Sequence, residues 1–111
     1  MSDIVLGKIG ILRVGMGGYQ DAMFGVTIGL AMKGSGCVDF KGTWSQSVKP
    51  SASADWTEET RSQHFATTMR WLDEQCRLAK VDDVMKLVGK PVEVTLDGLR
   101  LQSWRLLTEV L

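Results

Sequence analysis

The stretch GMGGYQD at residues 15–21 is the first segment whose residue types could do chemistry, because glycine-rich loops can cradle a phosphate group. Such loops lie between a strand and a helix N-terminus, since the helix supplies free amides and a favourable dipole. Here a strand-like alternation follows, and both the last glycine of the dinucleotide fingerprint and the Lys-Ser/Thr pair of a P-loop are missing. The pattern therefore predicts a hairpin connection with Tyr19, Gln20 and Asp21 exposed at its tip.

Side chains that could act as nucleophiles, acids or metal ligands are few and scattered. His64 is the only histidine, and no second ligand or nucleophile stands at a useful spacing from it. Cys37 and Cys76 form no CxxC pair, which favours two core thiols over a zinc site or a disulfide. No Ser/His/Asp or Cys/His order carries a local signature. We expect no catalytic residue, no cofactor and no metal, and an enzyme of unrecognised type remains an alternative.

The charge balance argues against a nucleic-acid or membrane partner. The chain has 13 basic and 13 acidic side chains, and no segment forms a basic patch. Four tryptophans could stack on bases, but no cationic groove accompanies them to compensate the phosphate charge. The start of the chain lacks the pattern of a signal peptide, and no apolar run approaches the roughly 20 residues that span a bilayer. We expect a cytoplasmic protein without direct nucleic-acid contacts.

Three segments in the first half are predicted to be strands. Residues 9–14 are short and rich in branched aliphatics. In residues 24–32 five large apolar residues alternate with smaller ones, so one face of that strand is apolar. The opposite face, with Gly25, Gly29 and Ala31, is nearly bare and leaves room for a close neighbour. After a turn at residues 33–36, the alternation continues through Val38, Phe40 and Trp44.

A polar segment and a long helix come next. Residues 45–55, SQSVKPSASAD, have the small polar composition of a mobile loop. Asp55 and Thr57 signal a helix N-cap, and acidic residues follow in the first turn. An apolar stripe with helical spacing is expected to lie on the sheet: Phe65, Met69, Leu72, Cys76 and Ala79. Trp71 and Leu78 form a flanking stripe, which either widens the buried face or offers a second contact.

The remaining elements are a short helix and a terminal hairpin. Asp82 is predicted to cap the short helix, which Gly89 and Pro91 end. Val92, Val94 and Leu96 alternate with polar residues as in a strand. Asp97-Gly98 then predicts a two-residue turn into a returning strand.

This order predicts one α+β domain over residues 1–111. The predicted order of elements is β-β-β-α-α-β-β. These elements are expected to form an antiparallel sheet of about five strands with one long helix packed on one face. One helix covers only one side of such a sheet, so the other side needs solvent, curvature or a second copy. We therefore expect a homodimer.

Aromatic side chains in loops mark the candidate partner-binding surface. Tyr19, Gln20 and Asp21 lie at the predicted hairpin tip, Trp44 leads into the loop at 45–55, and Trp56 follows it. Loop aromatics are frequent hot-spot residues of protein interfaces. The alternative is structural: Trp44 would close the edge of the core, and Trp56 would act as a hydrophobic staple at the helix start.

Several short motifs together resemble a family of small accessory proteins of unknown function encoded by tailed phages and prophages. These motifs are an opening strand with Gly7, the Phe24-Gly25 strand, the Gly34-Ser35-Gly36 turn and the LVGKPV segment at residues 87–92. The resemblance implies a phage accessory protein that acts by binding in the host cytoplasm.

Two binding functions follow from the resemblance. One is inhibition of a host defence protein, in the manner of an anti-CRISPR or another anti-defence protein. The other is an oligomer that sequesters a signalling nucleotide. A nucleotide would require convergent Arg or Lys side chains, and only Lys33, Lys41, Arg100 and Arg105 lie on strands that could converge. The balanced charge favours a protein partner.

Overall fold

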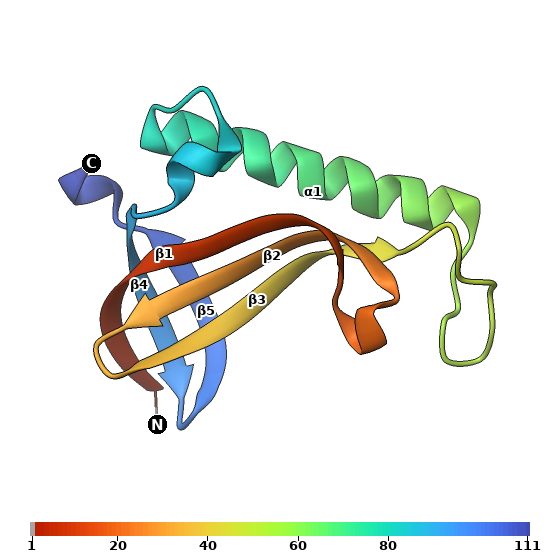
Figure 1. Cartoon of the computed structure of the whole chain (residues 1–111), viewed down its shortest axis with the longest axis horizontal. Coiled ribbons are helices and arrows are strands. Elements are labelled where there is room, and N and C mark those ends of the chain that lie inside the picture. The colour runs from red at the N-terminus through yellow and green to blue at the C-terminus, as the bar shows by residue number, and fades with distance from the viewer. Residues whose placement is uncertain (1) are drawn as a thin grey trace.

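The computed structural model describes residues 2–111, and they form one curled antiparallel sheet with a long helix along it (Figure 1). The strands are β1 (Ser2–Gly17), β2 (Met23–Met32), β3 (Ser35–Trp44), β4 (Pro91–Asp97) and β5 (Arg100–Leu106), and the helix is α1 (Glu58–Ala79). The order across the sheet is β3-β2-β1-β4-β5, and all neighbours are antiparallel. The predicted α+β class with five strands and one long helix is confirmed.

The long strand β1 is the centre of the sheet. It runs for 16 residues, far beyond the predicted residues 9–14, because its first part pairs with β4 and its second part with β2. Gly10 is an extra residue in the ladder, since Ile9 pairs with Leu30 and Ile11 with Gly29. This bulge shifts the alternation by one residue, so that Ile9 and Leu12 both point to the core while Ile11 points away.

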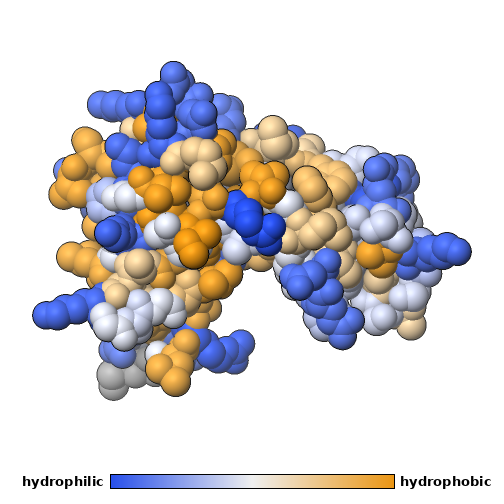
Figure 2. Space-filling view, viewed as in Figure 1, coloured by the Kyte–Doolittle hydropathy of each residue, from blue (hydrophilic) through white to orange (hydrophobic). Residues whose placement is uncertain are grey.

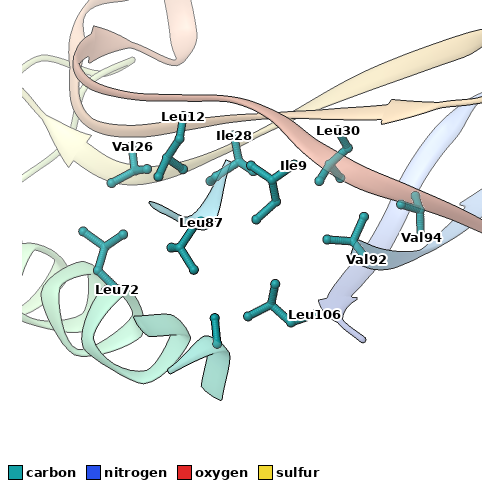
Figure 3. Packing of buried hydrophobic residues seen from close by; sticks show 11 residues of the cluster. Ile9, Leu12, Val26, Ile28, Leu30, Leu72, Leu87, Val92, Val94 and Leu106 are labelled. Atoms are coloured by element: carbon teal, nitrogen blue, oxygen red, sulfur yellow. The ribbon is translucent and has the colours of Figure 1, made fainter. Parts of the chain in front are cut away.

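The face of the sheet toward α1, here the inner face, carries the core. Ile28, Val92 and Val94 have no measurable exposure, and Ile9 and Leu87 are 1% exposed. Figure 3 shows the sheet residues converging on Leu72 from the helix and on Leu87 from the segment after it. The core is therefore purely aliphatic at its centre, with Trp71, Trp104 and both cysteines packed at its margin.

The two edge strands approach each other because the sheet is curled. Trp104 on β5 donates its indole N–H to Oδ2 of Asp39 on β3, at 2.8 Å. Trp71 of α1 meets Trp104 edge to face, with ring centroids 5.7 Å apart. Lys41 lies 4.9 Å from the centroid of the Trp71 ring and 3.8 Å from Asp39. This group, the Asp39–Trp104 latch, joins β3, β5 and α1.

The helix begins at the predicted cap. The Thr57 hydroxyl accepts a hydrogen bond from the Thr60 amide, and the Thr60 hydroxyl accepts one from the Thr57 amide. These two bonds satisfy two backbone amides at the start of the helix. The predicted stripe is buried unevenly: Leu72 and Ala79 are buried, Phe65 and Cys76 are half-buried, and Met69 is 66% exposed. The reason is geometric, since an open cleft lies between the middle of α1 and the end of the sheet formed by β1 and β2. Met69 therefore faces the sheet across this cleft without being packed on it.

The connections follow the predicted turn chemistry with one correction. The stretch 15–21 connects β1 to β2 as a hairpin, with Gly18 at φ 67° and a 3-10 helix at Tyr19–Asp21. The short second helix is a 3-10 helix at Val84–Leu87, and Asp83, not Asp82, caps it through the Met85 amide. Asp82 instead pairs with Lys86, which lies one turn along. Gly98, at φ 63°, turns β4 into β5.

Candidate functional site

An open cleft of about 440 Å³ lies between the middle of α1 and the end of the sheet formed by β1 and β2. Strands β1 and β2 form one wall, two turns of α1 form the other, and the end of β3 closes one side. Its lining is Val14, Phe24, Gly25, Val26, Ser45, Gln46, Phe65, Thr68, Met69 and Leu72. The volume falls in the range of pockets that accept small ligands or a few partner side chains.

Large apolar side chains line this cleft without being buried by it. Val14 is 57% exposed, Phe24 43% and Met69 66%, and Met16, which pairs with Phe24, is 39% exposed. Hydrophobic residues also gather over the middle and left of the broad face in Figure 2, between hydrophilic groups. Leaving such side chains in water forfeits about 1.5–3 kcal/mol each relative to full burial. A partner that covered them would recover part of that free energy.

Two of the polar side chains of the cleft, Ser45 and Thr68, are engaged within the chain, and the third, Gln46, is exposed. The Ser45 hydroxyl hydrogen-bonds to Oγ of Ser47 at 2.9 Å, and the Thr68 hydroxyl donates to the His64 carbonyl at 3.0 Å. Within the residues that the structure describes, no charged side chain lines the cleft. The site therefore offers apolar contact and little else, which suits an uncharged apolar group and disfavours an anion.

Two of the aromatic residues singled out from the sequence meet on the outer side of the same end of the sheet. The rings of Tyr19 and Trp44 are 6.1 Å apart and nearly perpendicular, and Tyr19 is 59% exposed. Gln20 and Asp21 complete the tip with φ values of 51° and 53°, a left-handed backbone that non-glycine residues adopt at a cost. The tip is thus a constrained, exposed surface rather than a loose loop.

Trp56 lies in a different environment. Its indole N–H donates to the Val48 carbonyl at 3.2 Å, and the Arg61 guanidinium lies 4.1 Å from the centroid of its ring. Arg61 is 3% exposed and pairs with Glu58 through Nη2, while its Nε and Nη1 find no hydrogen-bond partner among residues 2–111. Trp56 therefore connects the segment after β3 to the first turns of α1.

The remaining side chains that could take part in chemistry are Cys37, Cys76 and His64. Burial raises the pKa of the Cys37 thiol, and the charge of Asp39 adds to the shift. Burial also raises the pKa of Cys76, with smaller contributions from nearby aspartates. Both are free thiols in the described chain, and Nδ1 of His64 lies 3.4 Å from the Thr43 hydroxyl. Raised pKa values make these thiols weak nucleophiles at neutral pH.

Neither a metal cluster nor a membrane-spanning helix occurs in residues 2–111. No group of three or more His, Cys, Asp or Glu side chains is arranged to hold a metal ion there. No helix in the same range has both the length and the apolar character needed to cross a bilayer. The chain matches no protein-family model, no curated protein and no solved structure.

The sequence did not mark the residues that line the cleft as a binding site. Phe65 and Met69 belong to the same periodic stripe as the buried Leu72, and Phe24 to the same strand face as the buried Val26. Both patterns therefore include residues that are buried and residues that line the cleft. An apolar stripe of 15 residues facing a sheet that curls is the one sequence signal that points to an uncovered end.

Proposed function

We propose that this chain is a non-enzymatic binding protein that receives an apolar segment of a partner protein in the cleft between α1 and β1–β2. The exposure of Val14, Phe24 and Met69 around one cleft is the observation that carries the proposal. Exposed apolar side chains gathered at one place are typical of interaction sites. Methionines at the rim suit this role, because their flexible, polarizable side chains adapt to a partner surface.

The hairpin tip is the second part of the proposed surface. Tyr19 is exposed beside Trp44, and Trp44 immediately precedes Ser45, which lines the cleft. A partner that covers this end of the sheet would meet the apolar cleft from one side and the Tyr19–Trp44 pair from the other. Gln20 and Asp21 supply polar groups at the rim, as protein interfaces require.

We further propose that the partner is a host defence protein and that the chain is the product of a tailed phage or prophage, acting as an inhibitor in the host cytoplasm. The support is the resemblance of its short motifs to phage accessory proteins, together with the cleft. Sequestration of a signalling nucleotide is the less favoured function, because an anion would need cationic groups where this cleft has none among its described lining residues.

The test uses photo-crosslinking from the cleft in bacterial cells. A photo-reactive amino acid replaces Met69 in one variant and Leu99 in another, since Leu99 is fully exposed at the distant β4–β5 turn. We expect one predominant protein to crosslink from position 69 and not from position 99. The purified partner is then titrated calorimetrically with the wild-type chain and with Met69→Lys, Tyr19→Ala and Leu99→Lys.

We expect Met69→Lys to weaken binding by about tenfold or more, because it places a charge against an apolar surface. Tyr19→Ala should weaken it by a smaller factor, and Leu99→Lys should leave it unchanged. Equal affinities for Met69→Lys and wild type would refute the cleft as the binding site. Micromolar binding of a signalling nucleotide by the isolated chain would favour sequestration instead.

A further inference from the structure

Arg61 carries a buried charge with an incomplete set of hydrogen bonds. Its side chain is 3% exposed, and one nitrogen, Nη2, pairs with the Glu58 carboxylate. The other two nitrogens, Nε and Nη1, are enclosed and have no hydrogen-bond partner within residues 2–111. Unpaired donors on a buried charged group are costly, because the charge has lost its hydration. The guanidinium therefore has unused capacity to bind an acceptor.

The geometry of the guanidinium leaves one edge available to a planar acceptor. Arginine has two edges that can each donate a pair of parallel N–H bonds, one through Nε and Nη2 and one through Nη1 and Nη2. Nη2 has a hydrogen on each edge, and Glu58 takes one of them. Whichever edge Glu58 occupies, the other still offers Nη2 together with an unpartnered nitrogen. A carboxylate fits such an edge with both of its oxygens.

Arg61 lies at the end of α1 that adjoins the cleft. It precedes Phe65, which lines the cleft, by one helical turn, so the two side chains share a face of the helix. The guanidinium lies 4.1 Å from the centroid of the Trp56 ring, just before the helix N-cap, where the helix dipole favours an anion. A partner segment that fills the cleft therefore passes within about one helical turn of Arg61.

The charges around Arg61 favour a carboxylate over a phosphate. The resident partner Glu58 is itself a carboxylate, and its side chain is 68% exposed, so its exchange for another carboxylate costs little. Asp55 and Glu59 are exposed at the same end of the helix and add negative charge. A phosphate group carries more negative charge than a carboxylate at neutral pH and is repelled more strongly.

The segment at residues 46–55 is the part of the chain that can move aside from Arg61. It forms the loop beside the start of α1 (Figure 1), and every residue of it except Ala54 is exposed or half-buried. The Trp56 indole holds this segment by donating a hydrogen bond to the Val48 carbonyl, at 3.2 Å. A segment with so little buried surface opens far more readily than the folded core.

We propose that Arg61 binds a carboxylate group of the partner, which replaces Glu58 when the segment at residues 46–55 moves aside. The partner segment then combines an apolar part, which enters the cleft, with an aspartate, a glutamate or a C-terminal carboxylate about one helical turn away. This inference rests on the function proposed for the cleft only for the source of the carboxylate.

The first experiment titrates the isolated chain with sodium acetate at constant ionic strength and follows the arginine Nε–H resonances by NMR. Arg61→Gln identifies the Arg61 resonance, because that resonance disappears in the variant. We expect acetate to shift the Arg61 resonance. Glu58→Gln should lower the apparent dissociation constant of acetate by about threefold or more, since the competing carboxylate is gone.

Two further variants test the cover and the specificity of the shift. Trp56→Phe should also lower the apparent dissociation constant of acetate, because the ring contact with Arg61 remains while the bond to Val48 is lost. Arg70→Gln is the matched control, because Arg70 is exposed on α1 and contacts Thr67. It should leave the acetate titration of the Arg61 resonance unchanged.

The second experiment titrates the purified partner calorimetrically with wild type, Arg61→Gln and Arg70→Gln. We expect Arg61→Gln to weaken binding by about tenfold and Arg70→Gln to leave it unchanged. Circular dichroism establishes that Arg61→Gln is folded. If it is not, Arg61→Lys keeps the charge without the planar fork and should still weaken binding.

The outcomes separate this proposal from the function proposed for the cleft. An Arg61 resonance that about 100 mM acetate leaves unmoved, in wild type and Glu58→Gln alike, would overturn the carboxylate site even if position 69 crosslinks. Tighter binding of inorganic phosphate than of acetate would overturn the choice of a carboxylate. Acetate binding combined with an unchanged partner affinity in Arg61→Gln would overturn the partner as its source. Failure of crosslinking from position 69 would overturn the cleft and the partner as the source, while an acetate shift would still establish the site.

Discussion

At the scale of single residues, Arg105 shows how one side chain fixes the end of the chain. Its guanidinium donates two bonds of 2.8 Å to the Glu109 carboxylate, in the forked arrangement that arginine favours. It also reaches Glu93 on β4 at 3.3 Å. Arg105 therefore ties the 3-10 helix at Thr108–Val110 to two strands.

These contacts predict how the C-terminal segment responds to pH. The hydrogen bond from Arg105, as the largest cause, lowers the pKa of Glu109 from 4.5 to about 2. A carboxyl group with a lowered pKa stabilises the fold above its ordinary pKa, and this contribution is lost as the pH falls toward 2. We expect an NMR titration to place the pKa of Glu109 near 2 in wild type and clearly higher, toward 4.5, in Arg105→Gln.

Arg70→Gln is the control for that titration, because Arg70 contacts only the nearby Thr67 on the exposed side of α1. It should leave the Glu109 midpoint unchanged. A Glu109 midpoint that is the same with and without Arg105 would show that the fork does not form in solution.

At the scale of elements, a row of glycines lets the strands bend. Gly15, Gly25 and Gly42 are direct neighbours across β1, β2 and β3. A Cβ on Gly25 would overlap the Lys41 carbonyl oxygen and lie 2.6 Å from the Gly42 Cα. The bare strand face that the sequence predicted thus accommodates close approach between neighbouring strands at this row, rather than a bound ligand.

We therefore predict that Gly25→Ala destabilises the protein far more than Gly10→Ala. The added methyl at Gly25 meets backbone that can move only if the sheet flattens, so we expect a loss of about 2 kcal/mol or more. At Gly10 the nearest atom is the Ala31 Cβ at 3.4 Å, which is ordinary contact. Urea unfolding of the two variants measures the difference. Equal unfolding free energies would mean that the strands do not approach as closely as described.

At the scale of the whole molecule, the Asp39–Trp104 latch closes the curled sheet. Asp39 and Trp104 stand 65 residues apart in the sequence, on the two edge strands, and their hydrogen bond is reinforced by the contact of Trp104 with Trp71. Asp39 also accepts from the Phe40 amide at 2.8 Å. Closure of this kind protects strand edges that would otherwise pair with other chains.

We predict that Trp104→Phe lowers the free energy of unfolding by about 1–3 kcal/mol, because the Asp39 carboxylate loses its indole donor. Trp44→Phe is the matched control, since Trp44 contacts Tyr19 through its ring and a phenyl ring can keep that contact. Thermal and urea unfolding should show a clearly larger loss for Trp104→Phe. A larger loss for Trp44→Phe would instead place the critical packing at the hairpin tip.

The sequence by itself determined the local features of this protein. Alternation with a period of two located β2, β3 and β4, the cap at Thr57 located the start of α1, and Asp97-Gly98 located the last turn. It also placed Tyr19, Gln20 and Asp21 at an exposed tip. Such signals lie within a few neighbouring residues, where backbone conformation and short hydrogen bonds decide the structure.

Only the tertiary structure decided what these elements leave uncovered. The bulge at Gly10 turns Ile11 outward, the curl brings Trp104 to Asp39, and the packing of α1 on the sheet leaves Met69 exposed at a cleft. Periodicity assigned Met69 and Leu72 to one stripe, yet one is 66% exposed and the other 6%. Burial depends on contacts between segments far apart in the chain, so curvature and packing angle, not residue type, separate the core from the site.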